Sequence, residues 1–267
     1  MKICFISSLI FDSRGSNDKV GDFKPFGQYD FYLFTNLKDF TSTSWKVVYL
    51  EDSMLDILTN IFNHDYSDTK TCMENNIYKS RYIKFMGWHY LKNVMKKHYD
   101  VIFYCDAIYS PNINKNWEEA ALRIKENESG LMQKLHPLKT DPYSESFLCT
   151  RARKHNKQNH EKMIQYLKQV GAKETHIYEN TTFGYDPNNE KITQAYSDFW
   201  NIYSTKRLTY RDQPLWGWIC QKHNIKAVPV PNIHTNVVHK ITPPNDHFFF
   251  NFTGKNFNSS RNYNHVM

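Results

Sequence analysis

The sequence predicts an α/β fold in which a mixed, mostly parallel central sheet is flanked by helices. Strand-like and helix-like segments alternate through the first third of the chain, and such alternation is typical of parallel sheets with crossover helices. The apolar run at 99–107 stops on an acidic residue, as a buried central strand does where it reaches the edge of its sheet. At 267 residues the chain is long enough to bury a large core without a disulfide or a metal ion.

The first third predicts four strands and two helices. The opening apolar run, 2–10, is short, contains two serines and lacks a small-residue cleavage site, so it fits a buried strand better than a signal peptide. Later strands are rich in β-branched and aromatic residues, and the second helix carries apolar residues at helical spacing. We expect strands at 2–10, 31–35, 45–50 and 99–107, and helices at 54–63 and 75–98.

The remainder of the chain is more polar and predicts helices with two short strands. No linker divides it, so we expect one domain over 1–241, followed by an extended tail over 242–267 that is rich in Asn, Phe and Pro. The expected helices are 117–127, 156–170, 192–203 and 213–223, and the expected strands are 175–178 and 227–230.

Composition limits the classes of function. Lys and Arg number 34 against 27 Asp and Glu, a net charge of +7 that suits an anionic partner: nucleic acid, a membrane surface or a phosphorylated metabolite. With 18 Tyr, 18 Phe and 6 Trp the chain is not a disordered protein. Five cysteines form no CxxC pair, which favours a reducing, cytoplasmic location, and no apolar stretch is long enough for a transmembrane segment.

The sequence lacks the common signatures of several enzyme classes. It contains no HExxH, GxSxG, GxxxxGK[ST] or GxGxxG motif, so metalloproteases, α/β-hydrolases, P-loop NTPases and dinucleotide-binding enzymes are not indicated. The basic residues are scattered, and no zinc-finger or RNP pattern occurs, which argues against nucleic-acid binding.

Two acidic residues are candidates for chemistry. Asp106 ends the strand at 99–107, where a carboxylate either holds a divalent cation or caps the next turn. Asp212 precedes Pro214 at a predicted helix start, so it is either an N-cap or a general base beside a substrate hydroxyl.

Two basic residues complete this set. Arg81 and Lys84 lie three positions apart in the helix at 75–98 and share one face, where they could grip a diphosphate or simply face solvent. Among the histidines, His136, His234 and His239 are candidates for a metal ligand or a sugar contact, and a structural role is the alternative for each.

These features occur in a recognisable order over residues 30–225. The series consists of Arg81 and Lys84, the strand Tyr99–Asp106, His136-Pro137, Glu179-Asn180-Thr181, Phe199-Trp200 and Arg211-Asp212-Gln213.

In this order the chain resembles the hexosyltransferase-like GT-A glycosyltransferases of plant cell-wall and bacterial polysaccharide synthesis. Glycosyltransferases encoded by large algal viruses are similar too. The resemblance therefore also allows a virus-encoded protein that acts in the host cytosol. The resemblance implies a GT-A-like domain with a Rossmann-like nucleotide-sugar-binding half at 1–110 and an acceptor half at 111–241. It also implies a UDP- or GDP-linked sugar donor, a Mn²⁺ or Mg²⁺ cofactor, and transfer of a hexosyl or deoxyhexosyl group to a glycan or glycoprotein hydroxyl.

The resemblance assigns expected roles on the donor side. Asp106 takes the place of the metal-binding acid of the Asp-x-Asp motif, but Tyr104-Cys105-Asp106 supplies one acid instead of two. His234 and His239 are candidates for the missing metal ligands. Arg81 and Lys84 are expected at the donor phosphates, and the strands that hold Ser7 and Thr35 at the nucleoside.

On the acceptor side, Asp212 is expected to be the base if the reaction inverts the anomeric centre, and to orient sugar hydroxyls if it retains it. His136 and the rings of Trp200, Trp216 and Trp218 are expected to contact the acceptor, with core packing as the alternative for the rings.

Two other classes of function remain open at this stage. One is an inactive relative that binds carbohydrate. The other is a basic protein that binds nucleic acid or membrane surfaces.

Overall fold

A six-stranded sheet with the strand order β4-β3-β1-β5-β8-β7 forms the centre of the molecule. β1 is parallel to both β3 and β5, and β3 is parallel to β4. β8 is antiparallel to its two neighbours, β5 and β7. The predicted α/β class with a mixed, mostly parallel sheet is therefore confirmed. The strands are β1 (Ile3–Leu9), β3 (Asp30–Thr35), β4 (Lys46–Tyr49), β5 (Val101–Cys105), β7 (Leu131–Leu135) and β8 (Tyr178–Tyr185).

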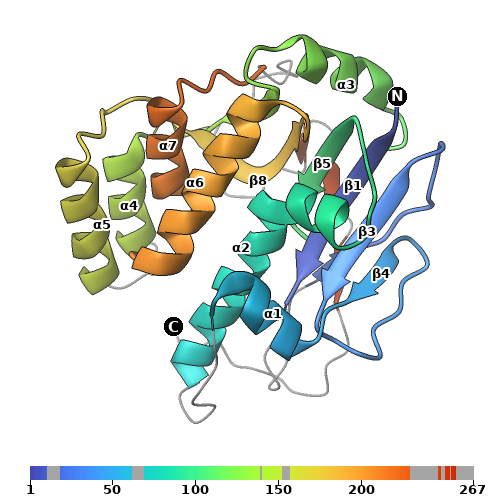
Figure 1. The fold of residues 1–267 in the computed structure, drawn as a ribbon, viewed down its shortest axis with the longest axis horizontal. Coiled ribbons are helices and arrows are strands. Elements are labelled where there is room, and N and C mark those ends of the chain that lie inside the picture. The colour runs from blue at the N-terminus through green and yellow to red at the C-terminus, as the bar shows by residue number, and fades with distance from the viewer. Residues whose placement is uncertain are drawn as a thin grey trace.

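Helices lie on both faces of this sheet, as the computed structural model in Figure 1 shows. α2 and α6 run along one face, α3 covers the other, and α4, α5 and α7 group beyond β8. The helices are α1 (Asp52–Thr59), α2 (Thr69–Asn93), α3 (Trp117–Glu126), α4 (Pro142–Arg151), α5 (Lys157–Gln169), α6 (Glu190–Lys206) and α7 (Gln213–Lys222).

The structure describes most of the chain. The described residues are 1–10, 19–61, 69–138, 140–151 and 157–228, with only the backbone for 19, for 69–73 and for three short strands, 246–247, 250–252 and 254–256. His234 and His239 lie outside them, so the structure does not place these two candidate metal ligands.

Alternation along the strands separates the core into two layers. On β1, Cys4 and Ile6 pack with α2, while Ile3, Phe5 and Leu9 pack with α3 on the opposite face. Successive side chains of a strand point to opposite faces, so the apolar run of β1 is buried on both sides. This two-sided burial is what the unbroken apolar run predicts.

Two predicted helices end earlier than expected because left-handed residues stop them. Asn60 has φ 54° directly after α1, and Lys96 has φ 54° shortly after α2. The N–H of Lys97 then donates to the carbonyl of Leu91 at 2.9 Å. Such left-handed residues close helix ends and satisfy free carbonyls, so α1 ends at Thr59 and α2 at Asn93.

The region between 127 and 190 departs most from the prediction. β7 and α4 were not expected, and β8 covers 178–185 instead of 175–178. Val228 makes a single bridge to Met132, and the rest of the strand predicted at 227–230 lies outside the described residues.

Short strands from the tail pair with segments near the start of the chain and after β5. β10 (Phe250–Phe252) is antiparallel to β9 (Asp246–His247) and to β6 (Tyr109–Pro111), which begins three residues after Asp106. β11 (Gly254–Asn256) is antiparallel to β2 (Lys19–Gly21). The backbone of the tail therefore passes beside the segment that follows the central strand.

No helix within the described part of the chain is both long and apolar enough to cross a bilayer.

Candidate active site

The candidate site lies where β5 ends and α2 crosses the sheet. Asp106 follows β5 directly, and its backbone N–H donates to the carbonyl of Thr181 on β8 at 3.0 Å. Ser8, near the end of β1, donates its hydroxyl to the carbonyl of Ser80 on α2 at 3.2 Å. In open α/β sheets, ligands bind outside the carboxyl ends of parallel strands, and this edge meets that description.

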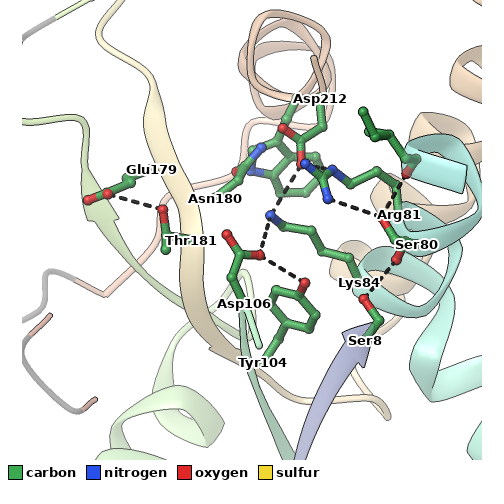
Figure 2. Close-up of polar contacts among 12 residues, drawn as sticks. Ser8, Ser80, Arg81, Lys84, Tyr104, Asp106, Glu179, Asn180, Thr181 and Asp212 are labelled. Carbon is green, nitrogen blue, oxygen red and sulfur yellow. Dashed lines mark hydrogen bonds and ion pairs between the residues drawn. The ribbon is translucent and has the colours of Figure 1, made fainter. Parts of the chain in front are cut away.

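Four charged residues meet at this edge, and we call them the charge cluster: Arg81, Lys84, Asp106 and Asp212. Lys84 Nζ lies 3.2 Å from Asp106 Oδ1 and 3.3 Å from Asp212 Oδ2. Arg81 Nε lies 3.0 Å from the same Asp212 oxygen. Figure 2 shows the two basic side chains reaching from α2 toward the two carboxylates. Arg81 and Lys84 share one face of α2, as their spacing predicts.

The members of the charge cluster differ in access to solvent. The side chain of Lys84 is 2% exposed and that of Asp212 is 4% exposed, whereas that of Asp106 is 34% exposed. Tyr104 donates its hydroxyl to Asp106 Oδ1 at 2.9 Å, so the two donors Tyr104 and Lys84 share that oxygen. Asp106 is therefore the accessible end of a largely buried array.

The ion pairs hold Asp212 in its ionised form. Burial alone raises the pKa of a carboxyl group, but the positive charges of Lys84, Arg81 and Arg211 outweigh burial and lower the pKa of Asp212 to about 2. A carboxylate with so low a pKa is a weak base.

Asp212 occupies the N-cap position of α7 without acting as a cap. Its backbone has φ −76° and ψ −28°, and its side chain accepts no hydrogen bond from the helix N–H groups. The sequence left an N-cap and a functional carboxylate as alternatives, and the structure commits the side chain to Arg81 and Lys84 instead of to the helix.

Several buried donors around Asp212 lack acceptors. Buried polar atoms normally have hydrogen-bond partners, so a group of unsatisfied N–H donors indicates a place for an oxygen-rich ligand. Within the described part of the chain, Asn180 Nδ2, Arg211 Nε and Gln213 Nε2 are buried without a hydrogen-bond partner, whereas Arg81 Nε is paired with Asp212 Oδ2.

Trp216 belongs to the core and not to an acceptor surface. Its ring is fully buried and stacks on Tyr196 at 5.0 Å, and its indole N–H donates to Gln133 Oε1 at 3.1 Å. No face of the ring is open to a sugar, which corrects the expectation that it contacts an acceptor.

Trp200 and Trp218 are also held by protein contacts. Trp200 is buried on α6 and lies edge-on to Tyr82 at 5.2 Å. Trp218 is half-buried and lies edge-on to Tyr166 of α5 at 5.6 Å, so it faces away from α2. The structure brings neither ring to the charge cluster.

His136 is part of a separate polar cluster. Its Nδ1 lies 2.9 Å from Thr140 Oγ1, and its Nε2 lies 3.8 Å from Glu145 Oε2. Cys149 donates to Glu145 Oε1 at 3.3 Å. These contacts fit a structural histidine that holds the start of α4.

Ser7 and Thr35 are buried on the other face of the sheet. Both are fully enclosed, and Thr35 Oγ1 accepts a hydrogen bond from the N–H of Leu37 at 3.2 Å. Ser8, one residue later on β1, faces α2 and the charge cluster instead. The alternation of β1 could have identified Ser8, because it lies two residues after the buried Ile6.

The described residues do not assemble a metal site. Mg²⁺ and Mn²⁺ take several oxygen ligands, but no group of three or more His, Cys, Asp or Glu side chains with suitable placement occurs in the described ranges. Asp106 contributes one carboxylate, and Lys84 already occupies its Oδ1. The described residues of the charge cluster therefore do not complete a divalent-cation site by themselves, and the positive charge that they supply comes from Lys84 and Arg81.

Comparisons with known proteins identify no family. No protein-family profile matches the sequence, and no curated protein matches it either. Solved structures do match, among them the apo form of mouse xyloside xylosyltransferase 1, with 9% sequence identity and a TM-score of 0.47. That match covers 86% of this chain and 85% of the mouse chain. A likeness at this level fixes no activity and no residue role.

Proposed function

We propose that this protein is a glycosyltransferase that moves a sugar from a nucleotide-diphosphate donor to a glycan hydroxyl. The observation that carries the proposal is the charge cluster at the carboxyl edge of the sheet, where a partly exposed Asp106 pairs with the buried Lys84, and the half-buried Arg81 pairs with Asp212. The ordered series of motifs that resembles GT-A glycosyltransferases includes all four residues of the charge cluster. UDP- and GDP-linked hexoses or deoxyhexoses are the donors to test first.

The reaction requires stabilisation of the leaving group. The bond between the anomeric carbon and the diphosphate oxygen breaks, the acceptor oxygen bonds to that carbon, and the acceptor proton is released. The diphosphate gains negative charge as it leaves, and fixed positive groups stabilise that charge. Arg81 and Lys84 hold two positive charges at this place, and the charge of Arg211 also acts on Asp212, so fixed cations are available to a leaving diphosphate.

The two carboxylates have different roles in this proposal. Asp106 is accessible to solvent and accepts hydrogen bonds from hydroxyl groups of the nucleotide-sugar donor. Asp212 is buried and ionised, and its pKa of about 2 makes it a poor proton acceptor in the free protein. Of its two expected roles, orienting a sugar hydroxyl has the better support.

Thermal unfolding with nucleotide sugars tests the proposal. We expect UDP- or GDP-linked sugars to raise the melting temperature of the wild type, because a ligand that binds only the folded state stabilises it. Asp106→Ala should abolish this rise. Glu126→Gln, which changes an exposed carboxylate on α3, is the control and should retain it. Release of UDP or GDP in the presence of a glycan then measures turnover.

Other outcomes would favour the other classes of function. Stabilisation by oligosaccharides without any effect of nucleotide sugars would indicate a carbohydrate-binding protein. Tight binding to arbitrary DNA that falls steeply with salt would indicate nucleic-acid binding.

A further inference from the structure

Asn180 is a buried polar residue at the candidate site that the charge cluster does not use. It lies on β8, one residue before Thr181, whose carbonyl accepts the N–H of Asp106 at 3.0 Å. Its side chain is buried, with a relative exposure of 2% for the residue. In Figure 2 the side chain extends from β8 toward Asp212.

An irregularity in the sheet turns Asn180 to this side. Gln133 pairs with Phe183 and Leu135 pairs with Tyr178, so a two-residue step on β7 faces a five-residue step on β8. Extra residues of this kind re-aim side chains and often occur beside functional sites. Gln133 is paired with Phe183, which lies in the core layer that contains α2 and α6. The side chain of Asn180 contacts Gln133 and therefore lies on the same side of the sheet.

The orientation of the Asn180 amide follows from hydrogen-bond chemistry. The indole N–H of Trp216 can only donate, so the group of Gln133 that faces it at 3.1 Å is the oxygen. The Gln133 nitrogen then donates to the carbonyl of Glu179 at 2.9 Å and to Asn180 Oδ1 at 2.8 Å. The Asn180 oxygen therefore faces Gln133, and its NH₂ group faces the other way.

This NH₂ group has no acceptor among the described residues. A buried donor without an acceptor costs free energy, so its fixed orientation toward the site indicates a ligand oxygen. In Figure 2 the Asn180 side chain points toward Asp212, whose ionised carboxylate repels a phosphate but accepts a hydrogen bond. A hydroxyl group suits both neighbours, because it accepts from an amide and donates to a carboxylate at the same time.

We infer that Asn180 and Asp212 together bind one hydroxyl group of the donor sugar, with Gln133 and Trp216 as positioning residues. This inference rests on the proposed function, since it assigns the sugar of the nucleotide donor to this place. Sites that hydrogen-bond a hydroxyl discriminate strongly against analogues that lack it. Asn180 therefore determines sugar specificity, while the diphosphate depends on the cations of α2.

The test compares affinities for nucleotide sugars and for the nucleotides alone. Titration calorimetry measures the affinities for UDP-glucose and UDP, and for GDP-mannose and GDP. The affinity for the nucleotide sugar divided by the affinity for the nucleotide alone gives the contribution of the sugar to binding. We expect Asn180→Ala to reduce this ratio about tenfold, the effect of one hydrogen bond to a charged or oriented group, and to leave affinity for the nucleoside diphosphate unchanged. Asn201→Ala, at an exposed asparagine of α6, is the matched control and should keep the wild-type ratio.

A donor that lacks the bound hydroxyl provides a second measurement. Among the single-deoxy analogues of the preferred sugar, one should bind wild type and Asn180→Ala equally well. An unchanged ratio in folded Asn180→Ala, or a wild type that binds the nucleotide sugar no better than the nucleotide, would overturn the inference while leaving the proposed function standing. A wild type that binds none of the four compounds would overturn both.

Discussion

Lys84 Nζ lies 3.3 Å from Asp212 Oδ2, and both side chains are almost completely buried. The same ammonium group is 3.2 Å from Asp106 Oδ1. One lysine on α2 therefore joins the end of β5 to the start of α7. Burying charges is costly unless they are paired, so this arrangement ties the stability of the fold to the chemistry of the site.

Replacing this lysine should destabilise the protein. Lys84→Met leaves Asp212 buried with one of its cations removed, and loss of one partner of a buried ion pair costs about 3 kcal/mol in unfolding free energy. Urea unfolding at neutral pH measures the loss. Lys46→Met is the control, because Lys46 is 64% exposed in its pair with Asp30, and an exposed pair contributes less than about 1 kcal/mol. Equal losses in the two variants would contradict a structural role for the charge cluster.

Asp212 should make stability depend on pH in the acid range. Its pKa is lowered from 3.8 to about 2 in the folded protein, which corresponds to about 2 kcal/mol of stability at neutral pH. Because the folded pKa is the lower one, this contribution is complete above about pH 4 and is lost as the pH falls toward 2. Unfolding free energies of the wild type and Asp212→Asn at several pH values from 7 to 2.5 isolate it, since other acids cancel in the difference. A difference that does not change with pH would show that Asp212 has an ordinary pKa.

The sequence predicts this site better than it predicts the surrounding elements. The strands that end near Ser8 and Asp106 are apolar runs, and the helical spacing of Arg81 and Lys84 is visible within a few residues. Local patterns of this kind determine local structure. Asp212 lies more than 120 residues further along the chain than Arg81 and Lys84. No residue spacing predicts that these side chains meet, and only the ordered series of motifs indicates it.

The parts that the sequence did not reveal depend on distant partners. β7 and β8 bury polar residues, Gln133 and Asn180, so neither strand shows apolar alternation. Gln133 is satisfied by Trp216, 83 positions away. The start of α4 does carry a sequence signal, the pair Asp141-Pro142. In the structure Asp141 accepts hydrogen bonds from the N–H groups of Tyr143 and Ser144 at 2.7 and 3.0 Å, as the residue before a helix commonly does. An Asp followed by Pro is a common helix start.

Metal chelation should have little effect on nucleotide binding. Lys84 already supplies positive charge at Asp106, and the described residues offer no further ligands for a divalent cation. We therefore expect EDTA to leave the rise in melting temperature caused by a nucleotide sugar unchanged, and Lys84→Met to abolish it. Loss of the rise in EDTA, with recovery on adding Mn²⁺, would contradict this prediction. Alanine variants of His234 and His239 would then show whether those residues are the missing ligands.

The indole N–H of Trp216 should matter more than that of Trp218, although both rings lie on α7. Trp216→Phe removes the donor to Gln133 Oε1 and leaves a buried oxygen unsatisfied, which costs about 1–3 kcal/mol in unfolding free energy. Trp218 is half-buried, and its indole N–H has no partner among the described residues, so Trp218→Phe should change stability by less than about 0.5 kcal/mol. Urea unfolding of the two variants measures the difference, with Phe keeping most of the ring packing in each. If the indole N–H of Trp216 contacted a glycan substrate instead of Gln133, Trp216→Phe would change the KM for the glycan and leave stability unaltered.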